Sequence, residues 1–289
     1  MPEKLINFLK NKNIKLNLYK LIFLGEGKNK VYTDEKYIIK IGKKSNLQNE
    51  KEILEKIKNK IKAPIFEGFF EYNENFKGEY ILILRLVKGI AVNKIWNSLG
   101  VYQKQEIAYS IIDELKKLHN LDKKKDEYIF TSELKNFQEN YKKVMKNVKN
   151  LNKKKLEKYA REFADFLEKK GDLVLIHNDL WYKNIIVDEG KFRGFIDFEL
   201  AKFSLKEAEY FRLKYHLFFA KLEESKVEIE FLEYLIGEMK KIYQDFTIYD
   251  NKIFRIYNII MYFSLASKYE YSWYNQSDID AFEKEFLLK

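Results

Sequence analysis

The hydrophobic pattern of this 289-residue chain changes from strand-like to helix-like near residue 88. Before that point, short runs rich in β-branched and aromatic residues alternate with turn-forming residues, which is typical of strands. The predicted strands cover residues 19–24, 31–32, 37–41, 65–72 and 79–87. After that point, helical patterns dominate. This order favours an α+β fold, and the length suits two lobes that share a cleft.

One internal helix is predicted within the strand-rich part. One face of it repeats at helical spacing through Glu50, Ile53, Leu54, Ile57 and Ile61. Pro64 is expected to end this helix. We therefore expect residues 1–88 to form a small antiparallel sheet with one helix, and residues 89–289 to form a larger, mostly helical lobe.

The chain has no cysteine, which excludes a disulfide scaffold, a thiolate metal site and a thiol nucleophile. The first residues show no signal-peptide pattern, and no run approaches the roughly 18 apolar residues that a membrane helix needs. We therefore expect a soluble, cytoplasmic protein with no membrane partner.

The formal charge of +10 is concentrated in one part of the chain. Residues 116–158 contain 14 lysines against 6 acidic residues, whereas residues 200–289 contain 13 basic and 15 acidic residues. Only five basic residues of the whole chain are arginine, the usual reader of bases and phosphates. Lysine-rich, solvated helix faces are therefore favoured over nucleic-acid binding.

Polar residues gather after an apolar strand predicted at 173–176. The segment His177-x-Asp179-x-x-x-x-Asn184 leads into a predicted hairpin, and Asp197-Phe-Glu follows it directly. A loop and a returning hairpin can bring two carboxylates and an amide oxygen to one cleft edge, where they suit Mg²⁺. The alternative is structural, with Asp179 and Asn184 in turn hydrogen bonds and Asp197 as a helix cap.

Lys40 stands in the middle of an otherwise apolar strand, where an ammonium group is costly unless it is paired or bound to phosphate. Glu50 lies on the inward face of the predicted helix and Glu52 points away from it, so Glu50 is the expected partner. Such a pair would position the lysine on the phosphates of a nucleotide. In the alternative, Lys40 extends into solvent from an edge strand.

The segment 24–31 contains Gly25-x-Gly27 between two predicted strands, so its backbone amides can lie over phosphates. A hairpin turn alone would also need glycine. The segment lacks the GxxxxGK[ST] pattern and leads into a strand rather than a helix, which excludes a P-loop and a Rossmann fingerprint.

The order of these parts is glycine loop, strand lysine, helix glutamate, His-x-Asp-x-x-x-x-Asn and Asp-Phe. In this order the chain resembles the aminoglycoside phosphotransferase and choline kinase superfamily, whose members are relatives of protein kinases. The resemblance runs from Gly25 to about Glu209 and lies in the ensemble of motifs. It implies a bilobal, protein-kinase-like fold.

The resemblance also implies roles for the site residues. Asp179 would be the catalytic base, braced by His177, and Asn184 and Asp197 would bind Mg²⁺. The residues expected to bind ATP or GTP are Gly25, Gly27, Asn29, Lys40, Glu50, Arg85 and Val87, the last two through the backbone segment that holds the base. The expected reaction moves the γ-phosphoryl group to a hydroxyl of a small molecule.

Two departures from kinase patterns bear on the substrate. Eukaryotic-type protein kinases carry His-Arg-Asp and Asp-Phe-Gly, where this chain has His-Asn-Asp and Asp-Phe-Glu, and no Ala-Pro-Glu segment is found. A small-molecule acceptor is thus favoured over a protein. Many relatives have an aspartate in the following helix, where Glu209 or Glu207 stands here, and the sequence leaves open which of them replaces it.

The acceptor is expected to bear an amine, because the last ninety residues are slightly acidic. Six of the thirteen residues 262–274 are aromatic and could hold an ammonium by cation–π attraction, as in the choline kinases that this segment loosely resembles. An aminoglycoside would prefer carboxylates. The candidate acceptor residues are Glu270, Tyr271, Trp273 and Asp278, with Asp280 as a further carboxylate.

Two alternatives come from other functional classes. An inactive kinase-like nucleotide-binding module would require a missing catalytic residue, and none is missing from the motifs. A lysine-rich nucleic-acid-binding protein would need the lysines of 116–158 on one face beside stacking aromatics, whereas the aromatic residues there are spaced as helical core.

Overall fold

The structure of the protein is a computed structural model that describes residues 2–14, 17, 20–72, 78–121, 123–124, 135, 138–139, 141–142, 157–158, 161–162, 165 and 173–242. The chain divides into two compact units. One comprises Met1–Leu118 with His177–Lys202, and the other comprises His119–Ile176 with Phe203–Lys289. The predicted lobe boundary between residues 88 and 89 stays a prediction.

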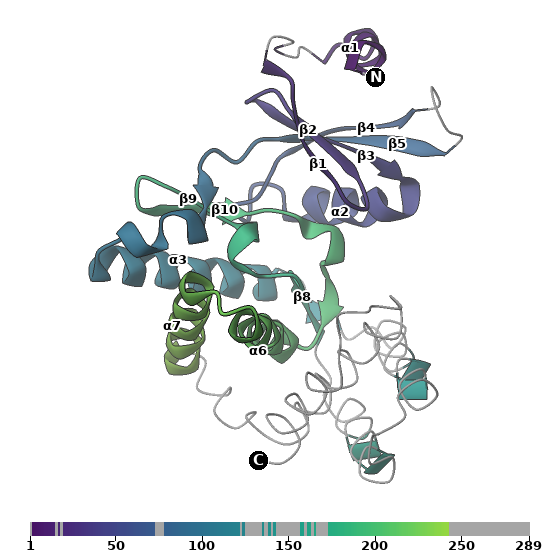
Figure 1. Ribbon diagram of the computed structural model, residues 1–289. Helices are drawn as coiled ribbons and strands as arrows, with labels where there is room; N and C mark the ends of the chain where they lie inside the picture. The colour runs from purple at the N-terminus through teal and green to yellow at the C-terminus, as the bar shows by residue number, and fades with distance from the viewer. Residues whose placement is uncertain are drawn as a thin grey trace. The chain divides into compact units, whose positions relative to one another are not determined.

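A five-stranded antiparallel sheet begins the first unit (Figure 1). Its strand order is β1-β2-β3-β5-β4. The strands are β1 (Ile22–Glu26), β2 (Lys30–Thr33), β3 (Tyr37–Lys43), β4 (Phe66–Tyr72) and β5 (Glu79–Arg85). All five strands were predicted, with ends that differ by a few residues. Because β3 is the central strand, the interpretation of Lys40 as an edge-strand residue is wrong.

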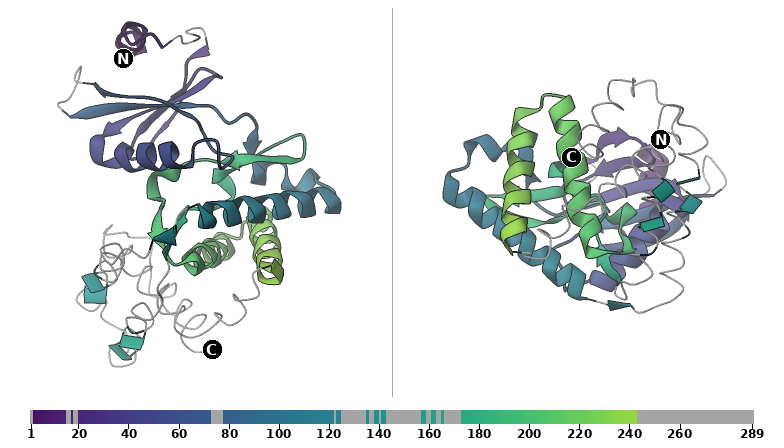
Figure 2. Two further views of the ribbon diagram at one scale, coloured as in Figure 1. Left: turned by 180° about the vertical axis from the view of Figure 1, so that it is seen from behind. Right: turned by 90° about the horizontal axis from the view of Figure 1, so that it is seen from below.

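Two helices cover opposite faces of this sheet (Figure 2). Successive side chains of a strand point to opposite sides of the sheet, so alternate residues of β3 belong to opposite faces. Helix α1 (Pro2–Asn11) packs on the face of Ile39 and Ile41. Helix α2 (Lys44–Ile57) covers the face of Lys40 and buries Leu47, Glu50, Ile53, Leu54 and Ile57.

Helix α2 ends earlier than the sequence indicated. It stops at Ile57, and Asn59 adopts a left-handed conformation that asparagine tolerates better than most residues. Ile61 therefore lies beyond the helix, although it remains buried. The apolar spacing predicted the buried face correctly, but the helix ends before Pro64, where the backbone of Lys58 becomes extended with ψ 128°.

The rest of the first unit carries short elements that build the candidate site. They are β6 (Ile90–Ala91), α3 (Val101–Asn120), β9 (Ile185–Asp188) and β10 (Lys191–Phe195), with the 3₁₀ turns η2 (Val92–Lys94), η3 (Trp96–Ser98), η4 (Tyr182–Asn184) and η5 (Phe198–Leu200). The predicted hairpin is β9 and β10, and β6 extends it to a three-stranded sheet.

The second unit combines a small sheet with helices. Its elements are β7 (Lys123–Lys124), β8 (Leu173–Ile176), β11 (Lys202–Ser204), α6 (Lys206–Leu222) and α7 (Lys226–Ile242). The sheet order is β11-β8-β7, and α6 packs against α7. Glu207 and Glu209 are fully buried, and a carboxylate oxygen of Glu209 lies 4.0 Å from His119 Nε2.

The α+β class is confirmed by the antiparallel sheet and the helical remainder. Within the described residues, no helix combines the length and apolarity needed to cross a membrane. The lysine-rich stretch 116–158 lies mostly outside the described residues, as do all the candidate acceptor residues of 270–280.

Candidate active site

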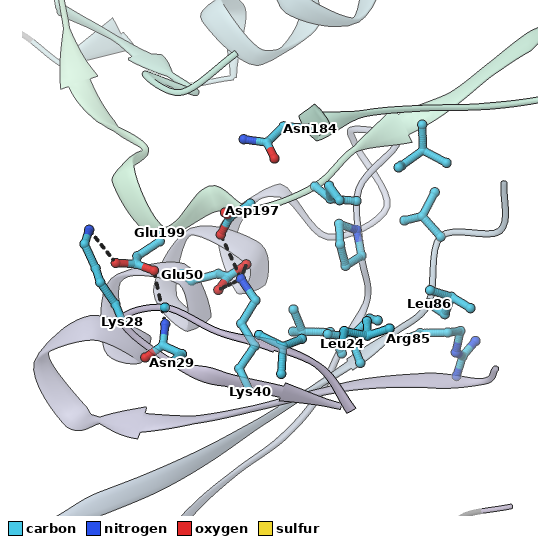
Figure 3. Close-up of a pocket in the computed structure, with 18 of the residues that line it drawn as sticks. Leu24, Lys28, Asn29, Lys40, Glu50, Arg85, Leu86, Asn184, Asp197 and Glu199 are labelled. Atoms are coloured by element: carbon cyan, nitrogen blue, oxygen red, sulfur yellow. Dashed lines mark hydrogen bonds and ion pairs between the residues drawn. The ribbon is translucent and has the colours of Figure 1, made fainter. Parts of the chain in front are cut away.

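A pocket of about 570 Å³ lies within the first unit, between the five-stranded sheet and the β9–β10 hairpin. Leu24, Val31 and Ile38 line it from the sheet, and Ile186 and Ile196 line it from the hairpin. Most of the polar residues of the pocket gather at one end, around Lys40, whereas Arg85 lies away from them (Figure 3). The pocket thus offers an apolar slot that leads to a charged end.

Lys40 occupies the charged end and binds two carboxylates. Its Nζ donates to both oxygens of Glu50, at 3.0 and 2.7 Å, and to Asp197 Oδ1 at 2.8 Å. Figure 3 shows Lys40 reaching from its strand toward these two residues. Glu52 is exposed and instead accepts a hydrogen bond from Gln48. The expected pairing of Lys40 with Glu50 rather than Glu52 is therefore present.

Burial and charge act in opposite directions on these groups. Burial lowers the pKa of Lys40, but the charges of Glu50 and Asp197 outweigh it and hold this pKa above its ordinary value of 10.5. Burial raises the pKa of Glu50, whose side chain is 0% exposed, and Lys40 offsets this only in part. Lys40 is consequently a fixed cation, held between a buried and a more exposed carboxylate.

Asp197 stands at the junction between β10 and η5. Its backbone is left-handed, with φ 65°, and its side chain makes no capping hydrogen bond, so the interpretation of Asp197 as a helix cap is wrong. Burial raises its pKa, but the charge and hydrogen bond of Lys40 prevail, so the pKa lies below 3.8. The side chain is 41% exposed, which leaves an ionised carboxylate open to the pocket.

The loop after β8 is held by hydrogen bonds to the segment before Asp197. His177 is fully buried, with its Nε2 2.9 Å from the carbonyl oxygen of Ile196. Asn184 Nδ2 donates to the carbonyl and to Oδ2 of Asp179, at 2.9 and 3.1 Å. The structure therefore brings Asp179 and Asn184 into contact. This bond agrees with the structural interpretation of the two residues and does not test their chemistry.

The segment Arg85–Val87 forms part of the pocket wall. The N–H of Arg85 donates to Ile65 and that of Leu86 donates to Lys36. Among the described residues, the N–H of Val87 has no backbone acceptor. The Arg85 side chain is about half exposed and pairs with Glu67.

The glycine loop joins β1 to β2. Gly27 N–H donates to the carbonyl of Asn29 at 3.2 Å, which closes the turn. Gly25 has φ +154°, a conformation that favours glycine, and the pairing of the two strands shifts register beside it. Gly27 and Asn29 line the pocket, whereas Gly25 lies in the strand leading to it.

The sequence pattern of the phosphotransferase enzyme family matches residues 25–223. This match covers more than half of the chain and includes every motif that lines the pocket. The chain belongs to the phosphotransferase enzyme family. None of the curated protein sequences matches it.

Solved structures of aminoglycoside phosphotransferases share the fold of this phosphotransferase-family chain. The ADP-bound APH(2'')-Ib is 18% identical, with TM-score 0.61, over 98% of this chain and 96% of that one. The GDP and kanamycin complex of APH(2'')-IIIa is 15% identical, with TM-score 0.67, over 98% of each chain. APH(4)-Ia, in the apo form of a thermostable mutant, is 12% identical, with TM-score 0.67, over 98% and 99%.

The protein-kinase-like fold and the superfamily predicted from the motifs are confirmed by these matches. The roles predicted for individual residues of this phosphotransferase-family site stay predictions, because geometry alone does not test them.

Three residues of the site were not selected from the sequence. Glu199 accepts hydrogen bonds from Lys28 and Asn29, and Asn49 donates to the carbonyls of Glu199 and Ala201. The signal for Glu199 was its position in Asp-Phe-Glu, where protein kinases have glycine. For Asn49 and Lys28 the sequence holds no comparable signal, since polar residues in such positions usually face solvent.

Proposed function

We propose that this protein is a kinase that moves the γ-phosphoryl group of ATP or GTP to a hydroxyl of a small, amine-bearing molecule. The observation that carries the proposal is the position of Lys40, held between Glu50 and Asp197 at the charged end of an otherwise apolar pocket. A fixed lysine of this kind positions phosphates in phosphoryl transfer. Membership in the phosphotransferase enzyme family agrees with this chemistry.

The nucleotide base would lie in the apolar slot. Leu24, Val31 and Ile38 would contact one face of the base, and Ile186 and Ile196 the other. The Val87 N–H, which has no backbone acceptor among the described residues, is a donor for the base edge. Its neighbours Arg85 and Leu86 use their own N–H groups within the protein. This supports binding through the backbone, which by itself favours neither ATP nor GTP.

The oxygen atoms at the charged end fit Mg²⁺. Asn184 turns its amide nitrogen toward Asp179, which directs its carbonyl oxygen elsewhere, and Asp197 keeps its second oxygen free of Lys40. A carboxylate and an amide oxygen match the few protein ligands of an ion that also binds substrate phosphates and waters. Asn184 and Asp197 would hold it, and its charge would neutralise the phosphate oxygens.

Asp179 would accept the proton of the attacking hydroxyl. Asn184, a residue of the same loop, donates a hydrogen bond to Asp179 Oδ2. This bond also fixes the direction of the other carboxylate oxygen of Asp179. His177 would brace this loop through its contact with the Ile196 carbonyl rather than move a proton. Positioning and charge neutralisation would supply most of the rate, as is usual in phosphoryl transfer.

Two observations support the proposed acceptor: the charge of residues 200–289 and the likeness of the fold to aminoglycoside phosphotransferases. Residues 200–289 contain 13 basic and 15 acidic residues, in contrast to the basic remainder of the chain. One similar structure is a kanamycin complex and another a gentamicin complex of aminoglycoside phosphotransferases. An aminoglycoside agrees with both observations, whereas a choline- or ethanolamine-type alcohol agrees with the charge alone. Action in the cytoplasm stays part of the proposal.

A screen of ADP and GDP release tests the function. The assay would contain Mg²⁺, ATP or GTP, and a panel of aminoglycosides, choline, ethanolamine, sugars and amino alcohols. One strongly stimulating acceptor is the expected result. Nucleotide binding without turnover on any acceptor would favour the inactive binding module instead. Salt-sensitive binding to RNA or DNA by a protein without turnover would favour the nucleic-acid alternative.

Asp179→Asn separates chemistry from binding. Loss of general-base catalysis typically costs about 10²–10⁴-fold in rate. We expect a loss of that size in kcat, with the dissociation constant for the nucleotide changed by less than about threefold. Unchanged turnover would contradict the role assigned to Asp179.

A further inference from the structure

Glu199 connects the segment after Asp197 to the glycine loop. Its Oε1 accepts a hydrogen bond from Lys28 Nζ at 3.1 Å, and its Oε2 accepts one from Asn29 Nδ2 at 3.2 Å (Figure 3). The Glu199 side chain is only 16% exposed, whereas that of Lys28 is 52% exposed. A single carboxylate thus holds two consecutive residues of the loop that lines the pocket.

Asn29 is seated against a glycine. A Cβ at position 42 would lie 2.0 Å from Asn29 Oδ1, so only glycine leaves room for this side chain. Asn29 is 8% exposed, and its Oδ1 has no hydrogen-bond partner among the described residues. The bond from Nδ2 to Glu199 is therefore what orients the amide, and Gly42 provides the space.

The backbone of Glu199 is fixed from α2. Asn49 Nδ2 donates to the carbonyls of Glu199 and Ala201, at 2.8 and 2.9 Å. Asn49 directly precedes Glu50, the buried partner of Lys40. The helix that positions Lys40 thereby also positions the residue that holds the glycine loop.

We propose that Glu199 is a positioning residue that acts through Asn29 to hold the glycine loop over the phosphates of the bound nucleotide. This inference rests on the proposed function, because it assigns the loop to nucleotide phosphates. Lys28 is the exchangeable partner: it is half exposed, and phosphate oxygens would compete with Glu199 for its charge. Asn29 carries no charge and would stay on Glu199 when the nucleotide binds.

An exchange of the amide of Asn29 and the carboxylate of Glu199 between the two positions tests this inference. Asn29→Asp places two carboxylates against each other and removes the donor. Glu199→Gln removes the negative charge. In the double variant N29D/E199Q, the amide of the new glutamine can donate to the new aspartate, so a hydrogen bond of reversed direction is restored. Gly42→Ala is an independent probe, because it displaces Asn29 without altering either partner.

The readouts are the dissociation constant for ADP, and KM and kcat for ATP in the presence of the best acceptor. We expect N29D to raise both the dissociation constant and KM by about tenfold, the size of one lost hydrogen bond to a charged group. Gly42→Ala should act in the same direction. The double variant should return to within about threefold of the wild type, with kcat changed less than KM throughout. Glu52→Gln, an exposed glutamate of α2, is the control for removing a negative charge.

Other outcomes would overturn the inference. If the fold-increases in the dissociation constant and in KM of the two single variants simply multiply in N29D/E199Q, Glu199 acts without Asn29, for instance directly on the metal or the phosphates. A fall in kcat with unchanged KM would also contradict loop positioning. A wild-type protein that binds no nucleotide refutes the proposed function, whereas normal wild-type turnover with unaffected variants refutes only this inference. Thermal unfolding of each variant shows whether it folds.

Discussion

Replacement of Glu50 by glutamine separates the role of this carboxylate in positioning Lys40 from its role in stability. Glu50 is fully buried and accepts two hydrogen bonds from Lys40 Nζ. Glutamine has nearly the same size but keeps one acceptor, its carbonyl oxygen, and its NH2 group repels the ammonium. Lys40 would retain Asp197 at 2.8 Å and move toward it. The carboxylate proposed to bind Mg²⁺ would then be neutralised by the lysine.

The two effects differ in size. One hydrogen bond to a charged group is worth about 1.5–3 kcal/mol, so kcat/KM for the nucleotide should fall by about 10- to 150-fold. Removing one partner of a buried ion pair costs about 3–5 kcal/mol when it leaves an unpaired buried charge. Lys40 keeps Asp197, and burial already raises the pKa of Glu50, which favours a neutral side chain there. We therefore expect the free energy of unfolding to fall by less than about 2 kcal/mol.

The measurements are steady-state release of ADP at varied ATP and urea unfolding of the same protein preparations. Glu52→Gln serves as the matched control, because Glu52 is exposed on the same helix, and it should change the free energy of unfolding by less than about 0.5 kcal/mol. Two results would refute the reasoning. One is unchanged kcat/KM in E50Q, and the other is a loss of stability above about 4 kcal/mol, which would make the pair mainly structural.

Three further predictions concern the same unit. Lys40→Met leaves Glu50 buried without its cation, so urea unfolding should show a loss of about 3–5 kcal/mol, larger than for E50Q; a smaller loss would mean that Glu50 is protonated or hydrated. Asp197 has a lowered pKa in the folded protein, so it contributes stability above pH 3.8 that is lost as the pH falls through the folded pKa. The difference in unfolding free energy between the wild type and Asp197→Asn should accordingly shrink below pH 3.8, and a constant difference would contradict the ion pair. Gly89→Ala should lower the free energy of unfolding by about 1–3 kcal/mol or more, because Gly89 has φ +130° and a Cβ there would lie 2.4 Å from the Val187 carbonyl oxygen. Gly27→Ala is the control and should change the melting temperature little, because a Cβ at Gly27 would enter open space.

The strands and the charged pair were predictable because each depends on local pattern. The apolar run around Lys40 defines a strand, and helical spacing places Glu50 on the buried face. The hairpin after Asn184 was predicted from alternation around a turn. The strand pattern repeats every two residues and the helical pattern every 3.6 residues, so both can be recognised in the sequence alone.

Contacts between distant segments were harder to predict. The bond between Asn29 and Glu199 joins residues 170 positions apart, and nothing in either local pattern pairs them. The contact of Asn29 with Gly42 depends on a close approach of the glycine loop to β3. Helix α2 ends early through the backbone of two residues, the extended Lys58 and the left-handed Asn59, although Pro64 was the stronger signal in the sequence.

The sequence by itself determined the α+β class, the family and the residue types of the site, because motif order and hydrophobic period are properties of the chain. Only the tertiary structure decided that Lys40 lies on the central strand and binds Asp197 as well as Glu50. It also decided that Glu199 faces the glycine loop. The physical reason is that charge pairing acts over a few ångströms in space, whatever the separation along the chain.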